Sequence, residues 1–130
     1  MSKGKKVLIV DDDEASLFIL TKMLNENGYE VEVANDGLTA LQYIDREPPC
    51  LVLLDLGLPK IKGEEVLKRI RKKRDRVLLP IVVITLKKDE DNVVECLEMG
   101  ANDYLTKPVN VNIALARIEM HLEMSTLKQS

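Results

Sequence analysis

Short apolar runs alternate along this chain with longer segments whose apolar residues recur at helical spacing. Three of the runs are apolar throughout, which is typical of strands buried on both faces of a parallel sheet. Residues 30–34 instead alternate polar and apolar positions, as a half-exposed strand near a sheet edge does. The predicted strands are Lys6–Val10, Glu30–Ala34, Leu51–Leu54, Pro80–Ile84 and Asp103–Leu105.

Amphipathic segments fill the intervals between these strands and follow the last one. In the first segment, Leu17, Leu20 and Leu24 form an apolar stripe, and Gly28 can cap its end. The helices are predicted from about Glu14 to Asn27, from the turn at residues 35–37 to Arg46, from Glu64 to Arg74, from a cap at Asp89 or Asp91 to Met99, and from about Asn110 to Leu127.

Strict alternation of strands and helices predicts an α/β fold. Five parallel strands would form one sheet, with five helices flanking its two faces and right-handed crossovers between strands. No linker or change of composition divides the chain, so we expect a single domain over residues 1–130, with its core at about residues 5–119. The length of 130 residues is the usual size of one domain.

Composition excludes several classes of function. The net charge of −3 gives no drive for bulk association with nucleic acid or with an anionic membrane. No apolar run approaches the ~20 residues that a membrane span needs, and the acids that follow the first strand do not fit a signal peptide. Cys50 and Cys96 have no metal-type spacing and are expected to be reduced thiols, so we predict a cytoplasmic protein.

Carboxylates stand at the ends of two buried strands. The first strand runs into Asp11 and Asp12, and the third runs into Asp55. The carboxyl edge of an open parallel sheet is where such folds bind their ligands. Because these acids would repel one another without a cation, we predict a site for a hard metal with one carboxylate to spare. Oxygen-only ligands suit Mg²⁺, Mn²⁺ or Ca²⁺ rather than zinc, and we expect Mg²⁺, with Mn²⁺ as the alternative.

A hydroxyl and an amine fall at the same sheet edge. Thr85 follows the fourth strand and Lys107 follows the fifth. A free oxygen of Asp55 could act as a nucleophile toward a phosphoryl group, since carboxylates form acyl phosphates. The metal and Lys107 would then offset the charge on the phosphoryl oxygens.

Four motifs together resemble the receiver domain of two-component response regulators. They are Val-Asp-Asp at 10–12, Asp-x-x-Leu-Pro-x-x-x-Gly at 55–63, Ile-Thr at 84–85 and Gly-Ala-x-Asp-Tyr-Leu-x-Lys-Pro at 100–108. The resemblance covers essentially the whole chain and keeps order and spacing. It implies a doubly wound, flavodoxin-like sheet with the strand order 2-1-3-4-5.

The resemblance also implies roles for single residues. Asp55 would accept the phosphoryl group, and Lys107 would pair with it. Asp11, Asp12 and Asp55 would hold Mg²⁺ together with the backbone carbonyl of Gly57. The donor would be a histidine kinase or a histidine phosphotransfer protein, and the chain would be a signalling receiver rather than an enzyme, apart from its own phosphotransfer and autodephosphorylation.

Two further residues would form the switch. Thr85 would move toward the phosphoryl group, and Tyr104 would turn into the space that it leaves. The surface formed by the fourth helix, fifth strand and fifth helix would then change, and with it the binding of an output domain, a target protein or a second copy of the chain.

The chain departs from the family pattern at several positions. Leu86 stands where a small residue is usual after the switch threonine, and we predict that it slows self-phosphorylation from small donors and hydrolysis by water. Lys87 adds charge beside the site. Leu58 replaces a common methionine at similar volume. Ile113 stands where receivers joined to winged-helix outputs usually carry glutamate, which disfavours that output class.

Three features outside these motifs are interpreted from their own residues. The basic run 69–76 fits either a partner contact or, as we prefer, a solvated helix face. His121 is interpreted as a surface or end-of-helix residue. Residues 120–130 extend the last helix, and Met120, Met124 and Leu127 at helical steps fit a coiled-coil linker, a dimer contact or a frayed turn.

Rival functions lack key residues. A haloacid-dehalogenase-like phosphatase needs a second acid two positions after the nucleophile, where this chain has Gly57. A flavodoxin-like cofactor binder needs a phosphate cradle after the first strand, where residues 11–14 are all acidic. A pseudo-receiver loses the acidic pair, the acceptor or the lysine, and this chain has all three.

Overall fold

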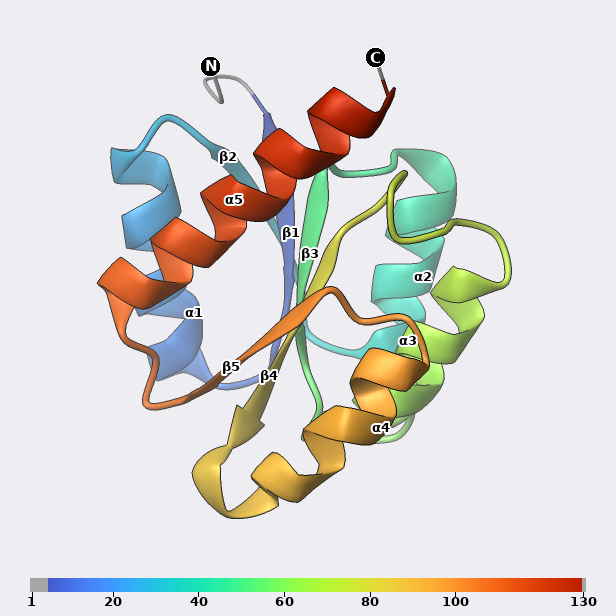
Figure 1. Ribbon diagram of the computed structural model, residues 1–130. Helices are drawn as coiled ribbons and strands as arrows, with labels where there is room; N and C mark the ends of the chain where they lie inside the picture. Colours follow the sequence, from blue (N-terminus) through green and yellow to red (C-terminus); the bar gives the residue numbers. More distant parts are fainter. Residues whose placement is uncertain (1–4, 130) are drawn as a thin grey trace.

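Five strands form a single parallel sheet between two layers of helices in the computed structural model of this chain (Figure 1). The structure describes residues 5–129, so residues 1–4 and 130 of the predicted domain lie outside it. The strand order β2-β1-β3-β4-β5 confirms the doubly wound arrangement, and every neighbouring pair is parallel. The strands are β1 Lys6–Val10, β2 Glu30–Ala34, β3 Leu51–Asp55, β4 Ile81–Leu86 and β5 Asp103–Lys107.

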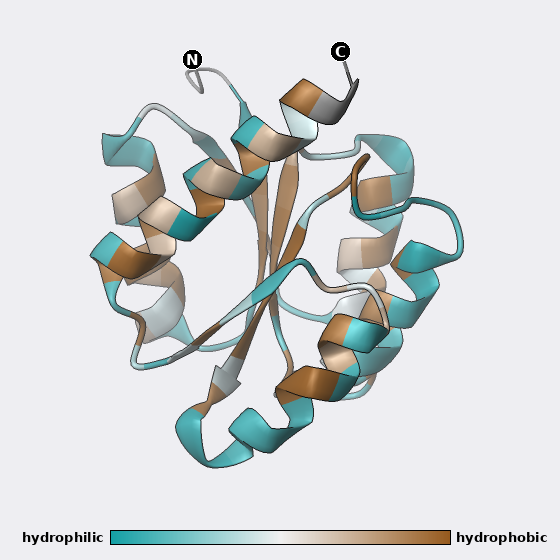
Figure 2. Cartoon of the chain, in the orientation of Figure 1, coloured by the Kyte–Doolittle hydropathy of each residue, from teal (hydrophilic) through white to brown (hydrophobic). Residues whose placement is uncertain are grey.

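The helices divide between the two faces of the sheet. Leu24 of α1 and Ile118 of α5 pack on one face, whereas Ile44 of α2, Leu67 of α3 and Cys96 of α4 pack on the other. Figure 2 shows the hydrophobic strands at the centre and hydrophilic segments on the outer surfaces of the helices. The helices are α1 Glu14–Glu26, α2 Gly37–Arg46, α3 Gly63–Arg71, α4 Val93–Glu98 and α5 Val111–Gln129.

Alternation along the strands supplies both cores. Val7 and Ile9 belong to the cluster under α1 and α5, and Leu8 and Val10 to the cluster under α2, α3 and α4. All four are fully buried, which explains why β1 has no polar residue between Val7 and Val10. The pairing of Val10 with Leu54 places the ends of β1 and β3 side by side.

The segment after β4 differs from the prediction. A helix was expected from a cap at Asp89 or Asp91, but residues Lys87–Asn92 form a 3₁₀ helix, and α4 begins only at Val93. The physical reason is that Lys87–Asn92 contains no buried residue, so nothing anchors a regular helix until Val93 and Cys96 reach the core.

Arg71 is an exception to the solvated face predicted for residues 69–76, where Arg69, Lys72, Lys73 and Arg76 are exposed. Its Nε donates to the carbonyl oxygen of Gly100 at 2.8 Å, and another guanidinium nitrogen donates to Oδ1 of Asn102 at 2.9 Å. Gly100 has φ of 119°, and a Cβ there would lie 2.8 Å from Cγ of Arg71. Arg71 therefore ties the end of α3 to the turn before β5.

His121 is also more buried than the surface position predicted from the sequence, and it contacts Asp103. Its Nε2 lies 2.9 Å from Oδ2 of Asp103, and its side chain is only 11% exposed. In the same part of α5, Leu122 and Ser125 are buried, whereas Met120, Met124 and Leu127 are exposed. Within the described residues, no helix is long and apolar enough to cross a bilayer.

Candidate functional site

Asp11, Asp12 and Asp55 meet at the carboxyl edge of the sheet. Asp55 is the last residue of β3, and Asp11 follows β1 on the neighbouring strand. One carboxylate oxygen from each of the three residues lies within 4.8 Å of the others. Asp11 and Asp55 are buried, whereas Asp12 is exposed.

Asp11 is a fully buried acid with incomplete hydrogen bonding. Its Oδ1 accepts the backbone N–H of Asp13 at 2.9 Å, but its buried Oδ2 accepts no hydrogen bond from the described part of the chain. Burial raises the pKa of the Asp11 carboxyl to about 6, against the lowering effect of the Asp13 N–H. An oxygen of this kind is suited to a cation.

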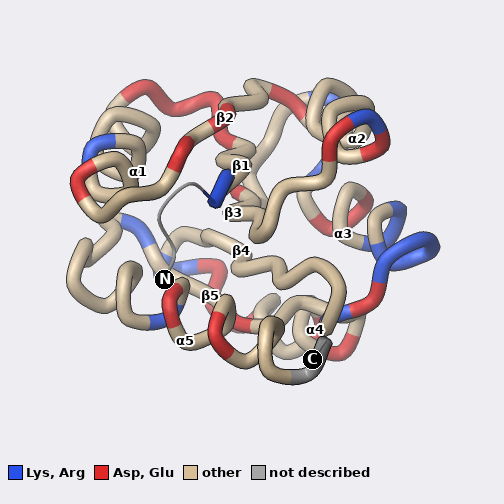
Figure 3. Tube along the Cα trace, turned by 90° about the horizontal axis from the view of Figure 1, so that it is seen from above, with Lys and Arg blue, Asp and Glu red and all other residues tan. Residues whose placement is uncertain are grey.

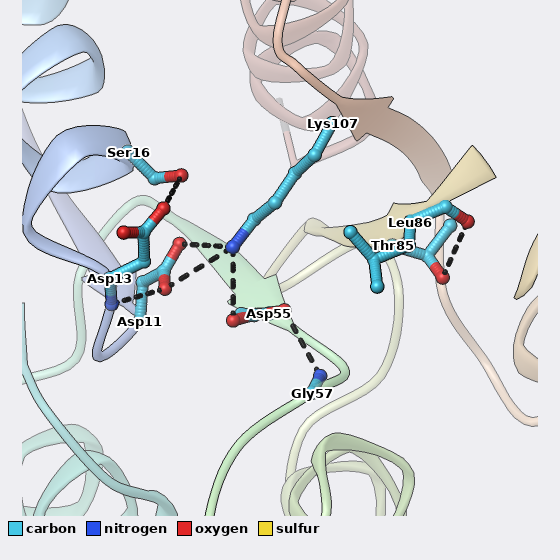
Figure 4. A network of polar contacts seen from close by, with 8 residues as sticks. All are labelled: Asp11, Asp13, Ser16, Asp55, Gly57, Thr85, Leu86 and Lys107. Atoms are coloured by element: carbon cyan, nitrogen blue, oxygen red, sulfur yellow. Dashed lines mark hydrogen bonds and ion pairs between the residues drawn. The ribbon is translucent and has the colours of Figure 1, made fainter. Parts of the chain in front are cut away.

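Lys107 joins the two buried acids (Figure 4). Its Nζ lies 3.3 Å from Oδ2 of Asp11 and 3.3 Å from Oδ2 of Asp55. Burial alone would lower the pKa of Lys107, but the two carboxylates raise it above the ordinary value. Lys107 therefore stays charged and reaches the site from the end of β5.

The loop after β3 orients Asp55. The backbone N–H of Gly57 donates to Oδ1 of Asp55 at 3.0 Å, so one oxygen is held by Gly57 and the other by Lys107. The loop turns back closely at Gly63, where a Cβ would lie 2.6 Å from Cα of Leu56 and 2.7 Å from the carbonyl oxygen of Asp55. Glycine at this motif position therefore lets α3 start beside the site.

Asp13, in contrast, turns away from the acidic cluster. Its carboxylate accepts the hydroxyl of Ser16 at 2.8 Å, and this hydrogen bond lowers its pKa. It stands at the N-cap position of α1 and contributes its backbone N–H to Asp11.

No hydrogen bond joins Asp55 to Thr85 or Tyr104 among the described residues. The hydroxyl of Thr85 donates to the carbonyl oxygen of Leu86 at 3.4 Å, as Figure 4 shows. Tyr104 donates its hydroxyl to Glu90 at 3.0 Å, and the guanidinium of Arg117 lies 5.5 Å from the centre of the Tyr104 ring. The hydrogen bond to Glu90 raises the pKa of Tyr104.

Sequence reasoning missed Glu90 and Arg117. Glu90 is one acid among several in an exposed segment, and nothing in its spacing points to Tyr104. Arg117 lies thirteen positions after Tyr104, yet it donates to the Tyr104 carbonyl oxygen and stacks on the ring. Only the packing of α5 beside β5 reveals this pair.

The donor atoms at the site fit a hard divalent cation. Three carboxylates supply only oxygen, and no histidine or thiol joins them among the described residues. Mg²⁺, Mn²⁺ and Ca²⁺ take such ligands, whereas zinc favours nitrogen and sulfur. Oδ2 of Asp11 accepts no hydrogen bond from the described residues and lies 3.3 Å from the Lys107 ammonium, so it already faces positive charge.

Comparison with known proteins settles the family. The family model of the response regulator receiver domain matches residues 7–119. The chain belongs to this family. It is therefore a phosphorylation-controlled signalling domain of a two-component system, and the resemblance seen in the four motifs is confirmed.

Relatives and solved structures agree with this assignment. The alkaline phosphatase synthesis transcriptional regulatory protein PhoP of Bacillus subtilis is 40% identical over 95% of this chain and 51% of its own length. The chain thus spans about half of that relative. The receiver domain protein (CheY-like) of Methanospirillum hungatei superposes with a TM-score of 0.88 at 34% identity, covering 97% of this chain and 99% of that one. NtrX of Brucella abortus gives 0.89 at 30% identity, covering 97% of this chain and 29% of that one.

Proposed function

We propose that Asp55 accepts a phosphoryl group from a histidine kinase or a histidine phosphotransfer protein. The observation that carries this proposal is the position of Lys107, whose ammonium lies 3.3 Å from both Asp11 and Asp55. Asp11, Asp12 and Asp55 would hold Mg²⁺, with the carbonyl oxygen of Gly57 as a further ligand. When bound, the ion supplies positive charge to the phosphoryl oxygens.

The step is a displacement at phosphorus. An oxygen of Asp55 forms a bond to the phosphorus atom, and the bond from phosphorus to the donor's imidazole nitrogen breaks, leaving its electron pair on that nitrogen. Gly57 and Lys107 hold the carboxylate in place beforehand. Lys107 then remains beside the new acyl phosphate and balances its charge.

The positions of Thr85 and Tyr104 support the interpretation that this structure is the inactive, unphosphorylated state of the switch. The Thr85 hydroxyl makes only a long hydrogen bond of 3.4 Å, so little is lost when it turns to a phosphoryl oxygen. Tyr104 would then leave Glu90 and turn inward, which changes the surface of α4, β5 and α5. Exposed apolar residues of α5, including Ile113 and Met124, support a partner there, whether an output domain, a target protein or a second copy.

The same geometry supports a receiver rather than a turnover enzyme. The position two residues after Asp55 is Gly57, which offers the site a backbone N–H but no acid to protonate a leaving group. We propose that the acyl phosphate is lost only by slow autodephosphorylation. We propose that the protein acts in the cytoplasm, where a histidine kinase would phosphorylate it.

Leu86→Ala is expected to accelerate phosphorylation by a small acyl phosphate donor. Leu86 is 47% exposed beside Thr85, so its side chain stands where a small donor or a water molecule would approach. Initial rates measured by intact mass in the presence of Mg²⁺ check this, with Leu86→Met as the volume-matched control. Equal rates for Leu86→Ala and the wild-type protein would show that Leu86 does not restrict access to Asp55.

A further inference from the structure

A groove between α2 and α3 lies away from the phosphorylation site. It has a volume of about 270 Å³, an apolar floor that includes Leu41, Ile44 and Ile70, and a rim that includes Lys72 and Arg74. Each helix starts at the sheet edge that carries Asp55 and runs back, so these last turns lie at the opposite edge. The groove therefore takes no part in phosphotransfer.

Positive charge gathers at one end of this groove. Residues 68–76 contain seven lysines and arginines and a single acid, although the whole chain has a net charge of −3. Figure 3 shows this blue segment at the end of α3 and in the loop that follows. A chain that is acidic as a whole thus presents one concentrated basic surface.

Part of this charge is already used within the fold. Arg71 is bound to Gly100 and Asn102, Arg69 pairs with Glu65 at 3.0 Å, and Lys73 pairs with Asp45 at 3.3 Å. Lys68 and Lys72 are exposed and make no ion pair with any described residue. The two lysines remain available to an anionic partner.

Arg74 adds an unsatisfied donor to the wall of the groove. One terminal nitrogen donates to the carbonyl oxygen of Ile44 at 3.4 Å, but the buried Nε has no hydrogen-bond partner in the described part of the chain. Leaving a buried charged donor unpaired is costly. The Arg74 side chain as a whole is half-buried and lines the groove, so it adds positive charge to the wall.

The size and composition of the groove decide what it can hold. Its volume falls below the ~300–1,000 Å³ of pockets that enclose cofactor-sized ligands, so it suits a single large apolar side chain. The charged backbone of a nucleic acid would not fill the apolar floor. The chain also has a single Phe and no Trp, which leaves few aromatic side chains for base stacking. Cations around an apolar slot instead match acidic residues around an apolar anchor.

We propose that the groove between α2 and α3 docks an acidic segment of a partner protein that carries one large apolar residue. The apolar side chain enters between Leu41, Ile44 and Ile70. Its flanking carboxylates meet Lys72 and Lys68, beside the half-buried guanidinium of Arg74. The proposal is independent of Asp55 and of the phosphorylation chemistry.

A labelled synthetic peptide, in which a central phenylalanine is flanked by glutamates, tests the proposal with the full chain. We expect saturable binding by fluorescence anisotropy at low ionic strength, and amide NMR shifts confined to the last turns of α2 and α3. Replacing the peptide's phenylalanine by alanine should weaken binding at least about tenfold. Lys72→Glu should weaken it about threefold to tenfold, whereas Lys22→Glu, an exposed lysine on the opposite face, should not.

Several outcomes would overturn the proposal. Equal binding of the peptide without its phenylalanine would reduce the site to nonspecific charge. Tighter binding of a DNA duplex, NMR shifts on another surface, or no binding of the acidic peptide would each exclude this docking role. The thermal midpoints of both variants check that they fold. We expect midpoints near the wild-type value, because Lys72 and Lys22 are exposed and neither makes an ion pair within the described chain.

Discussion

Lys107→Ala is expected to bind Mg²⁺ more tightly than the wild-type protein and yet to accept phosphoryl groups far more slowly. Removing a cation 3.3 Å from both Asp11 and Asp55 deepens the negative potential of the site, which should raise Mg²⁺ affinity roughly tenfold. The transition state loses its fixed positive partner, which should slow phosphorylation by a small acyl phosphate at least about 100-fold. Calorimetric titration and intact-mass kinetics measure the two effects.

Lys107→Arg is the matched control for this experiment. It keeps the charge but replaces a compact ammonium by a planar guanidinium, so we expect Mg²⁺ affinity near the wild-type value and an intermediate rate. Opposite changes in affinity and rate distinguish a role in the reaction from simple damage to the fold. A Lys107→Ala variant that loses both together would contradict the account.

Asp11→Asn is expected to stabilise the metal-free protein while removing its response to Mg²⁺. Burial raises the pKa of Asp11 to about 6 from the ordinary value of 3.8, so the folded state binds a proton more readily than the unfolded state. The charged form therefore destabilises the fold as the pH rises from about 4 to 7, by at most about 3 kcal/mol above that range. Asparagine keeps an oxygen for the Asp13 N–H without the charge.

Thermal unfolding in a chelator at several pH values measures this effect. The stability difference between Asp11→Asn and the wild-type protein should be absent near pH 4 and reach about 1–3 kcal/mol above pH 7. Mg²⁺ should raise the midpoint of the wild-type protein only. Asp45→Asn removes an exposed acid paired with Lys73 and should change stability little. A destabilised Asp11→Asn variant, or one that still responds to Mg²⁺, would contradict the assignment of Asp11.

Much of the fold could be predicted because each strand has a strong local signal. Residues 7–10 and 51–54 are apolar at every position, and the structure buries all of them. The acids that interrupt these runs mark the sheet edge, so the convergence of Asp11 and Asp55 followed from parallel pairing alone. A carboxylate at the end of a buried strand is costly unless it binds a ligand, which is why these acids could be assigned to a site.

The remaining features depend on distant contacts that leave no periodic trace. Arg71 is one of several neighbouring cations in the sequence, and only the turn at Gly100 selects it for an internal role. His121 and Asp103 meet because α5 crosses β5, a geometry that residue spacing does not encode. The bond from Tyr104 to Glu90 likewise depends on the 3₁₀ helix that replaced the expected start of α4.

Intact mass spectrometry with a small acyl phosphate donor tests the central claim most directly. We predict that the wild-type protein gains one phosphoryl group in the presence of Mg²⁺, that a chelator prevents the gain, and that Asp55→Asn gains none. Leu86→Ala is included so that restricted access to small donors cannot mask an active site. A phosphoryl group on Asp55→Asn, or none on both the wild-type protein and Leu86→Ala, would contradict the assignment of Asp55 as the acceptor.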